Sequence, residues 1–235
     1  MTSIADNLKQ VRERIALACA RAGRPVHTVT LLAVSKTHDA DAVRAAAAAG
    51  QGAFGENYVQ EALAKIAATA GLRPRLEWHL IGPLQSNKTR IVAETFDWVH
   101  TVDRPKVAQR LAEQRPPDRP PLNVCLQVNI SGEASKSGVA VAEVAALARS
   151  VAALPGLKLR GLMAIPEPAA DEEAQRAPHR ALKQLFDDLN RLGFALDTLS
   201  IGMSADLEAA IAEGATIVRV GTAIFGERVS RAGDG

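Results

Sequence analysis

Lys36 is the residue of this sequence best placed to do covalent chemistry. It follows an apolar and β-branched run at 29–34 and the polar Ser35, where a buried strand is expected to end. Lysine is rarely buried, and burial of an amine favours its neutral, nucleophilic form. Such an amine can form a Schiff base with a carbonyl compound. Two interpretations without chemistry stay open: Lys36 extends into solvent, or it pairs with a carboxylate such as Glu56.

A second group of residues, near the end of the chain, could bind an anion. The small residues of the segment 200–206 (SIGMSAD) would let the backbone approach a ligand closely. Ser204 could cap the following helix and direct its free N–H groups at a phosphate, and Gly221 and Thr222 offer two further donors. A serine at a helix start is most often only a cap. Together with the amine, however, these residues predict a ligand that carries both a carbonyl and a phosphate.

Arg219 is the third residue that could act on a ligand. It stands between Val218 and Val220 in a predicted core strand, so its guanidinium needs a partner inside or near the site. Two interpretations are open. Arg219 could bridge to a carboxylate such as Glu56, or it could donate to an acceptor atom on the ring of a ligand.

Eight short strands, each but the last followed by a helical segment, are predicted to position these residues. The strands are expected at 29–37, 52–56, 76–82, 97–102, 122–130, 158–165, 198–203 and 216–222. Helices are expected at 39–49, 57–68, 86–94, 104–114, 141–154, 171–192 and 205–213, with a further amphipathic helix before the first strand. That additional helix would cover the bottom or the flank of the structure.

This alternation fits a single (β/α)8 TIM barrel of parallel strands better than an open, doubly wound sheet. The doubly wound alternative lacks the GxGxxG turn that its dinucleotide-binding form needs. The proline-rich segment 115–121 could be a linker, but seven residues also suit an ordinary connection, so we expect one domain over residues 1–235. A barrel carries its chemistry at the carboxyl ends of the strands, where Lys36, Ser204, Gly221 and Thr222 are all expected.

The composition limits the partners of the protein. Lys and Arg total 28 against 26 Asp and Glu, a formal net charge of +2, so charge gives no reason to expect a nucleic acid or an anionic membrane. Cys19 and Cys125 lack the spacing of a metal or redox site. With no signal-like leader or long apolar run, we expect a cytoplasmic protein whose thiols are reduced.

Five segments of the chain, in order, resemble the YggS-like family of pyridoxal phosphate homeostasis proteins. They are LLAVSKT, FGENYVQE, WHLIGPLQSNK, NISGEASKSG and LSIGMSADLEAAIAEGATIVRVGTAIFG. The resemblance implies the barrel of the alanine racemase N-terminal type, without that enzyme's additional β domain, and pyridoxal 5′-phosphate (PLP) as cofactor. It also implies the site residues: a Schiff base on Lys36, phosphate contacts from Ser204, Gly221 and Thr222, Arg219 beside the pyridine nitrogen, and Asn57 and Ser200 as further neighbours.

An arginine beside the ring nitrogen argues against strong catalysis. PLP withdraws electrons most strongly when its ring nitrogen is protonated, usually opposite an aspartate. Arginine can only donate, so Arg219 should keep this nitrogen unprotonated. Racemisation also needs a second acid or base, which the racemases are expected to draw from the missing domain as a tyrosine. The single tyrosine here, Tyr58, is not directed at the cofactor by anything in the sequence.

We therefore expect a protein that holds PLP reversibly and takes part in intracellular vitamin B6 homeostasis, with PLP-dependent apo-enzymes as candidate recipients. The alternatives are a weak racemase or another amino-acid-transforming enzyme, and a cofactor-free phosphosugar enzyme of the same barrel class. Lys136, in the polar loop 131–138, could be a transient second amine for PLP, although a solvated loop is the simpler interpretation. His79 could tune the site, or be a satisfied core histidine.

Overall fold

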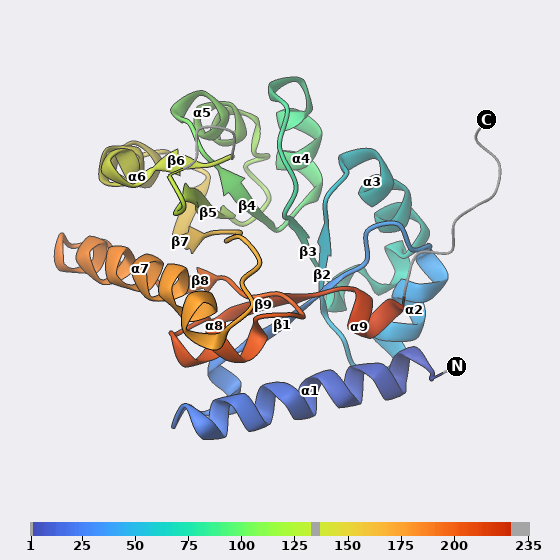
Figure 1. The fold of residues 1–235 in the computed structure, drawn as a ribbon. Helices are drawn as coiled ribbons and strands as arrows, with labels where there is room; N and C mark the ends of the chain where they lie inside the picture. Colours follow the sequence, from blue (N-terminus) through green and yellow to red (C-terminus); the bar gives the residue numbers. More distant parts are fainter. Residues whose placement is uncertain (1, 133–136, 227–235) are drawn as a thin grey trace, which may run out of the picture.

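The computed structural model, which describes residues 2–132 and 137–226, is a closed barrel of parallel strands surrounded by helices (Figure 1). The barrel strands in this part of the chain are β1 (Thr30–Val34), β2 (Ala53–Glu56), β3 (Glu77–Leu80), β4 (Trp98–Val102), β5 (Leu122–Asn129), β7 (Leu157–Met163), β8 (Thr198–Ser200) and β9 (Ile217–Val220). They lie in the order β1-β2-β3-β4-β5-β7-β8-β9, and β9 pairs with β1 to close the ring. The predicted barrel is confirmed, and the open sheet is excluded.

Helices follow the strands along the chain and cover the outside of the barrel (Figure 1). In the described residues they are α1 (Ile4–Arg21), α2 (Ala40–Ala48), α3 (Val59–Ala68), α4 (Thr89–Thr95), α5 (Pro105–Gln114), α6 (Val144–Ala152), α7 (Glu172–Arg191), α8 (Leu207–Ala212) and α9 (Thr222–Phe225). Ser3 and Asp6 form a capping box on α1, and Asp39 and Asp171 cap α2 and α7, so side chains satisfy N–H groups at these helix starts. Over the described residues, every helix is too short or too polar to cross a lipid bilayer.

Some element boundaries differ from the sequence prediction. The sequence does not predict the short strand β6 (Val139–Ala140), which pairs with β5, or the helix α9. Elements of two to four residues are too short to show a periodic pattern. The predicted helix at 205–213 is shorter, since α8 begins after Asp206. The expectation that Ser204 caps this helix is therefore wrong, and any role of Ser204 rests on its own hydroxyl and on the loop around it.

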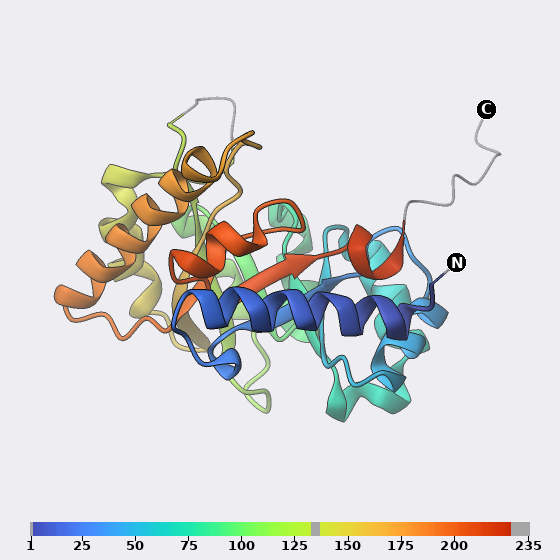
Figure 2. The ribbon, with the colours of Figure 1, turned by 60° about the horizontal axis from the view of Figure 1, so that its bottom comes forward.

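The additional N-terminal helix covers the flank of the barrel. α1 runs beside β9 and packs against α8 and α9 (Figure 2). The side-chain amide of Asn7 donates to the carbonyl of Ile224 in α9 at 2.9 Å, and Arg14 forms an ion pair with Glu208 of α8 at 2.9 Å. The first helix of the fold is thus fastened to the last two.

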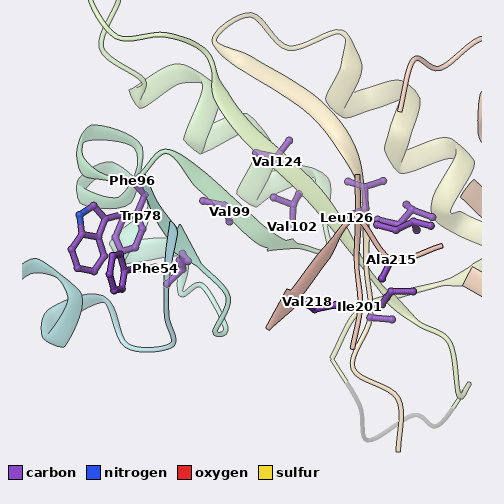
Figure 3. Packing of buried hydrophobic residues seen from close by; sticks show 14 of the residues in the cluster. Phe54, Trp78, Phe96, Val99, Val102, Val124, Leu126, Ile201, Ala215 and Val218 are labelled. Carbon is purple, nitrogen blue, oxygen red and sulfur yellow. The ribbon is translucent and has the colours of Figure 1, made fainter. Parts of the chain in front are cut away.

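The main hydrophobic core lies between the strands and the helices. Phe54, Trp78 and Phe96 gather in one part of this layer (Figure 3), and the ring centroids of Phe54 and Trp78 are 5.6 Å apart. Full burial of each such large side chain stabilises the fold by about 1.5–3 kcal/mol. This layer fixes the positions of the strands, and hence of the residues at their ends.

The alternation of side chains along each strand decides which residues face the barrel interior. Leu31 and Ala33 of β1 join the outer core, whereas Leu32 and Val34 form a separate interior cluster. Continuing this alternation past the end of β1 places Lys36 on the interior side. The interior also buries polar side chains, namely His79, His100, Ser200 and Arg219.

Candidate functional site

A cavity of about 540 Å³ opens at the carboxyl ends of the barrel strands. Its lining residues are Val34, Lys36, Thr37, His38, Asn57, Ile81, Ile165, Met203, Ser204, Ala205, Arg219, Gly221, Thr222 and Gly226. Every site residue predicted from the sequence lines this cavity except Ser200. Ser200 is fully buried beneath it and contacts Arg219 instead.

Lys36 is half-buried and contributes the amine of the cavity. Among the described residues it forms no hydrogen bond or ion pair, so the amine is available to a ligand. The alternative pairing with Glu56 is wrong. That carboxylate instead accepts from Lys65 Nζ at 2.8 Å and from the hydroxyl of Ser35.

Arg219 is held firmly by backbone and hydroxyl acceptors. Its Nη1 donates to the carbonyl oxygen of Ser200 at 2.5 Å and to the Ser200 hydroxyl at 2.9 Å, and its Nη2 donates to the carbonyl of Ala164 at 2.9 Å. A bridge to Glu56 is therefore excluded. Burial lowers the pKa of Arg219 to about 10, against the opposing effect of Asp206, so the side chain is still a cation at neutral pH. A guanidinium has five N–H donors, and those left over can serve a ligand in the cavity.

Two buried histidines extend this hydrogen-bond chain into the barrel. His100 Nδ1 lies 2.8 Å from the Ser200 hydroxyl, and His100 Nε2 lies 2.9 Å from Nδ1 of His79, whose ring stacks on Trp98 at 5.2 Å. Burial first, and then the neighbouring His79 and Arg219, lower the pKa of His100 well below its usual value. His100 is thus neutral, and His79 is connected to the site without lining it.

The loop that carries Ser204 is pinned by residues outside the cavity. Asp206 accepts from the backbone N–H of Met203 at 2.6 Å and pairs with His179 Nε2 at 2.9 Å. Burial acts to raise the pKa of Asp206, but these hydrogen bonds outweigh it and leave the pKa lowered. Arg14 of α1 also donates to the carbonyl of Ser204 at 3.1 Å. The Ser204 hydroxyl is therefore presented by a fixed loop.

Gly221 and Thr222 bring the start of α9 to the same cavity. A Cβ on Gly221 would lie 3.1 Å from the carbonyl oxygen of Val34, so the absence of a side chain lets β9 end close to β1. In α9 the N–H groups of Ile224 and Phe225 already donate to the carbonyl of Gly221, which leaves those of Thr222 and Ala223 at the helix start without an intrahelical acceptor. Together with the hydroxyls of Ser204 and Thr222, they form a set of donors suited to an anion.

Two titratable residues of this region, His38 and Lys65, were not predicted to belong to it. His38 lines the cavity and stacks on Phe225 at 5.1 Å, and burial, followed by the charge of Lys65, lowers the pKa of His38. His38 follows the end of a strand. The rule that barrel chemistry lies at the carboxyl ends of the strands, which selected Lys36, could therefore also have selected His38. Lys65, within the helix predicted at 57–68, is buried beside Glu56, and no local pattern indicates this.

Other candidates lie away from the cavity or outside the described residues. Tyr58 is 57% exposed and is not part of the lining. Lys136 falls outside the described residues. Where the chain is described, no three His, Cys, Asp or Glu side chains gather as the ligands of a metal ion would.

Most of the chain matches a known protein family and its relatives. Residues 6–229 match the family model described as alanine racemase, N-terminal domain. A pyridoxal phosphate homeostasis protein of Pseudomonas aeruginosa is 62% identical over 228 residues, which cover 97% of each chain. Another from Escherichia coli K12 is 56% identical over 229 residues, covering 97% of this chain and 98% of the relative.

Solved structures share the same architecture. PipY of Synechococcus elongatus, solved with PLP bound, is 38% identical and superimposes with a TM-score of 0.83, covering 95% of this chain and 100% of PipY. An alanine racemase of Clostridium difficile has a TM-score of 0.71 at 13% identity, covering 94% of this chain and 57% of the racemase. At that identity the likeness concerns the fold alone.

Proposed function

This chain belongs to the pyridoxal phosphate homeostasis proteins within the alanine racemase N-terminal domain family, and on that premise we propose that it binds PLP through Lys36 and holds it reversibly. One observation carries the proposal: a lysine amine without a partner among the described residues and a buried, fixed arginine line the same cavity as a set of anion donors. That combination matches a ligand with an aldehyde, an aromatic nitrogen and a phosphate.

The residues of the cavity fit this cofactor. The Asn57 side-chain oxygen is buried with no hydrogen-bond partner among the described residues, so it could accept from a ring hydroxyl. Val34, Ile81 and Ile165 provide apolar walls for a flat ring. The donors of Ser204 and Thr222 would hold the phosphate, and Gly221 would let it approach the backbone.

When bound, PLP supplies an aldehyde with which an uncharged amine condenses, releasing one water. Lys36 Nζ is the group that would attack the aldehyde carbon. Arg219 would donate a hydrogen bond to the ring nitrogen and, being a cation, would keep a proton off it. Asn57 and the anion donors would orient the ring so that the aldehyde faces Lys36.

A carrier fits the cavity better than an enzyme. An arginine at the ring nitrogen disfavours carbanion chemistry. Tyr58 is exposed to solvent and does not line the cavity, which leaves His38 as the remaining titratable lining group besides Lys36 and Arg219. A weak racemase-like activity that uses His38 is therefore the second candidate, and a panel of amino acids incubated with the purified protein should show no turnover if the carrier proposal is correct.

We extend the proposal to the compartment and the partners of the protein. The buried thiols of Cys19 and Cys125 suit the reducing cytoplasm, and apo-enzymes that need PLP are the natural recipients of a reversibly held cofactor. Lys136 stays a candidate for a second, transient amine. Unchanged transfer of PLP to an apo-enzyme by Lys136→Ala would remove that idea.

The test is spectroscopic. The purified protein should be yellow, and borohydride should fix the cofactor onto a peptide that contains Lys36. Lys36→Ala should lose both properties while its circular dichroism stays that of the wild type. Lys158→Ala, which removes an exposed lysine of β7, is the matched control and should keep them. A colourless wild type after addition of PLP would refute the proposal.

A further inference from the structure

Thr37, the residue after Lys36, has a backbone conformation that calls for explanation. Its φ is 68°, and it is the sole non-glycine with a positive φ in the described parts of the chain. A β-branched side chain rarely adopts this left-handed region. Such strain persists where the surrounding structure imposes it, and it is concentrated at functional sites.

Glu61 and Lys65, one turn apart on α3, impose it. Glu61 Oε1 accepts the backbone N–H of Thr37 and also accepts from Lys65 Nζ at 2.6 Å. Lys65 Nζ in turn donates to the backbone carbonyl of Ser35 at 2.6 Å. The two side chains therefore bind the polypeptide immediately before and immediately after Lys36.

Glu56, Glu61 and Lys65 lie outside the lining of the cavity, whereas Thr37 belongs to it. Lys65 and Glu56 form an ion pair at 2.8 Å in which the side chains are 5% and 0% exposed. Replacing a buried ion pair by apolar residues is often neutral or stabilising, so stability alone does not explain its presence. Lys36, in contrast, has no partner of its own among the described residues. Its direction is set by the backbone on which it stands.

We infer that Glu61 and Lys65 are positioning residues for Lys36: by fixing the peptide groups on both sides of it, they aim its amine into the cavity. The inference rests on the proposed function, because it is the capture of an aldehyde that requires an aimed amine. Neither Glu61 nor Lys65 lines the cavity, so both act through the backbone.

The strain at Thr37 gives a test that a purely structural role would not pass. Glu61→Ala removes the acceptor of the Thr37 N–H, and we expect capture of added PLP, followed by visible absorbance, to slow by about tenfold or more. Glu61→Gln keeps an acceptor oxygen and should capture PLP close to the wild-type rate. Glu61→Ala combined with Thr37→Gly should recover part of the rate, because glycine adopts a φ of 68° without strain.

Two controls complete the experiment. Glu13→Ala removes an exposed glutamate from α1 and should leave capture unchanged. Hydrogen exchange of the Thr37 amide in the ligand-free proteins should show protection in the wild type and in Glu13→Ala, and loss of protection in Glu61→Ala. This measurement needs no cofactor.

The outcomes separate the two proposals. If the wild type captures PLP and Glu61→Ala captures it equally fast although the Thr37 amide has lost protection, the positioning role is refuted and the proposed function stands. If Glu61→Ala captures PLP slowly and the added Thr37→Gly restores none of the rate, the loss reflects a general change in structure. The positioning role is then also refuted. If the wild type captures no PLP, both proposals fall together.

Discussion

The buried hydroxyl of Ser200 accepts a hydrogen bond from the guanidinium of Arg219 at 2.9 Å. The same hydroxyl lies 2.8 Å from His100 Nδ1, so the proton of Ser200 is best assigned to the bond with His100. His100 then carries its own proton on Nε2 and donates to His79. Arg219 is therefore the first donor of a directed chain of hydrogen bonds that runs through Ser200 and His100 to His79 in the barrel interior.

Ser200→Ala should loosen Arg219. The substitution removes an acceptor of the guanidinium and the partner of His100, which leaves buried polar groups unsatisfied and should cost about 1–3 kcal/mol in the free energy of unfolding. Urea denaturation followed by circular dichroism measures this loss. Ser150→Ala, on an exposed position of α6, should change stability by no more than about 0.5 kcal/mol. Equal stability of the two variants would contradict the role assigned to Ser200.

The neutral state of His100 predicts a loss of stability in acid. Burial lowers its pKa in the folded protein well below the ordinary value of 6.5, so below about pH 6.5 the unfolded chain binds the proton more readily. The free energy of unfolding should then fall by up to about 1.4 kcal/mol for each pH unit below that point. His100→Asn should lack this component, whereas the exposed His27→Asn should retain it. Urea unfolding between pH 7.5 and pH 5 distinguishes the two.

Gly82→Ala should disturb the cavity through its neighbour. A Cβ at Gly82 would lie 2.1 Å from the backbone oxygen of Asn57, so the backbone that carries this cavity residue must move. We expect a destabilisation of about 1–3 kcal/mol or more and a weaker affinity for PLP in equilibrium dialysis. Gly71→Ala is the control, since nothing lies within 4 Å of its added Cβ. An unchanged affinity in Gly82→Ala would mean that Asn57 does not contribute to the site.

Lys65→Met should destabilise the protein strongly at neutral pH. Glu56 would be left as an unpaired buried carboxylate, at a cost of about 3–5 kcal/mol. Burial already raises the pKa of Glu56 against the effect of Lys65, so without Lys65 the group should take up a proton more easily. The deficit should therefore shrink as the pH falls. Adding Glu56→Gln should recover much of the stability at neutral pH, and thermal denaturation of the single and double variants tests both expectations.

Much of this architecture is present in the sequence as local pattern. The barrel follows from eight alternating segments, and the rule that barrels place chemistry at strand ends is sufficient to select Lys36 and Thr222, which line one cavity. The elements that escape prediction are short ones, such as α9, which carry too little periodicity.

Sequence patterns do not predict the contacts between residues that are distant along the chain. Lys65 stands in an Ala-rich helix, where spacing alone suggests a solvated amine. It is buried because Glu56, on the neighbouring strand, faces α3 and needs a counter-ion. The positive φ of Thr37 accompanies a second long-range contact, the hydrogen bond from its N–H to Glu61 of the same helix. Likewise, Ser200 stands in an apolar strand, and its role depends on Arg219 from the next strand and His100 from across the barrel.

The position of β9 has a consequence for the order in which the cavity is completed. Among the described strands β9 comes last along the chain, yet it is inserted between β1 and β8, and it brings Arg219 and then Thr222 to the amine that follows the first strand. Without β9 the ring of strands would be open between β1 and β8, and the cavity would lose Arg219 and Thr222. The cavity is accordingly complete only when the first and the last of these strands have paired.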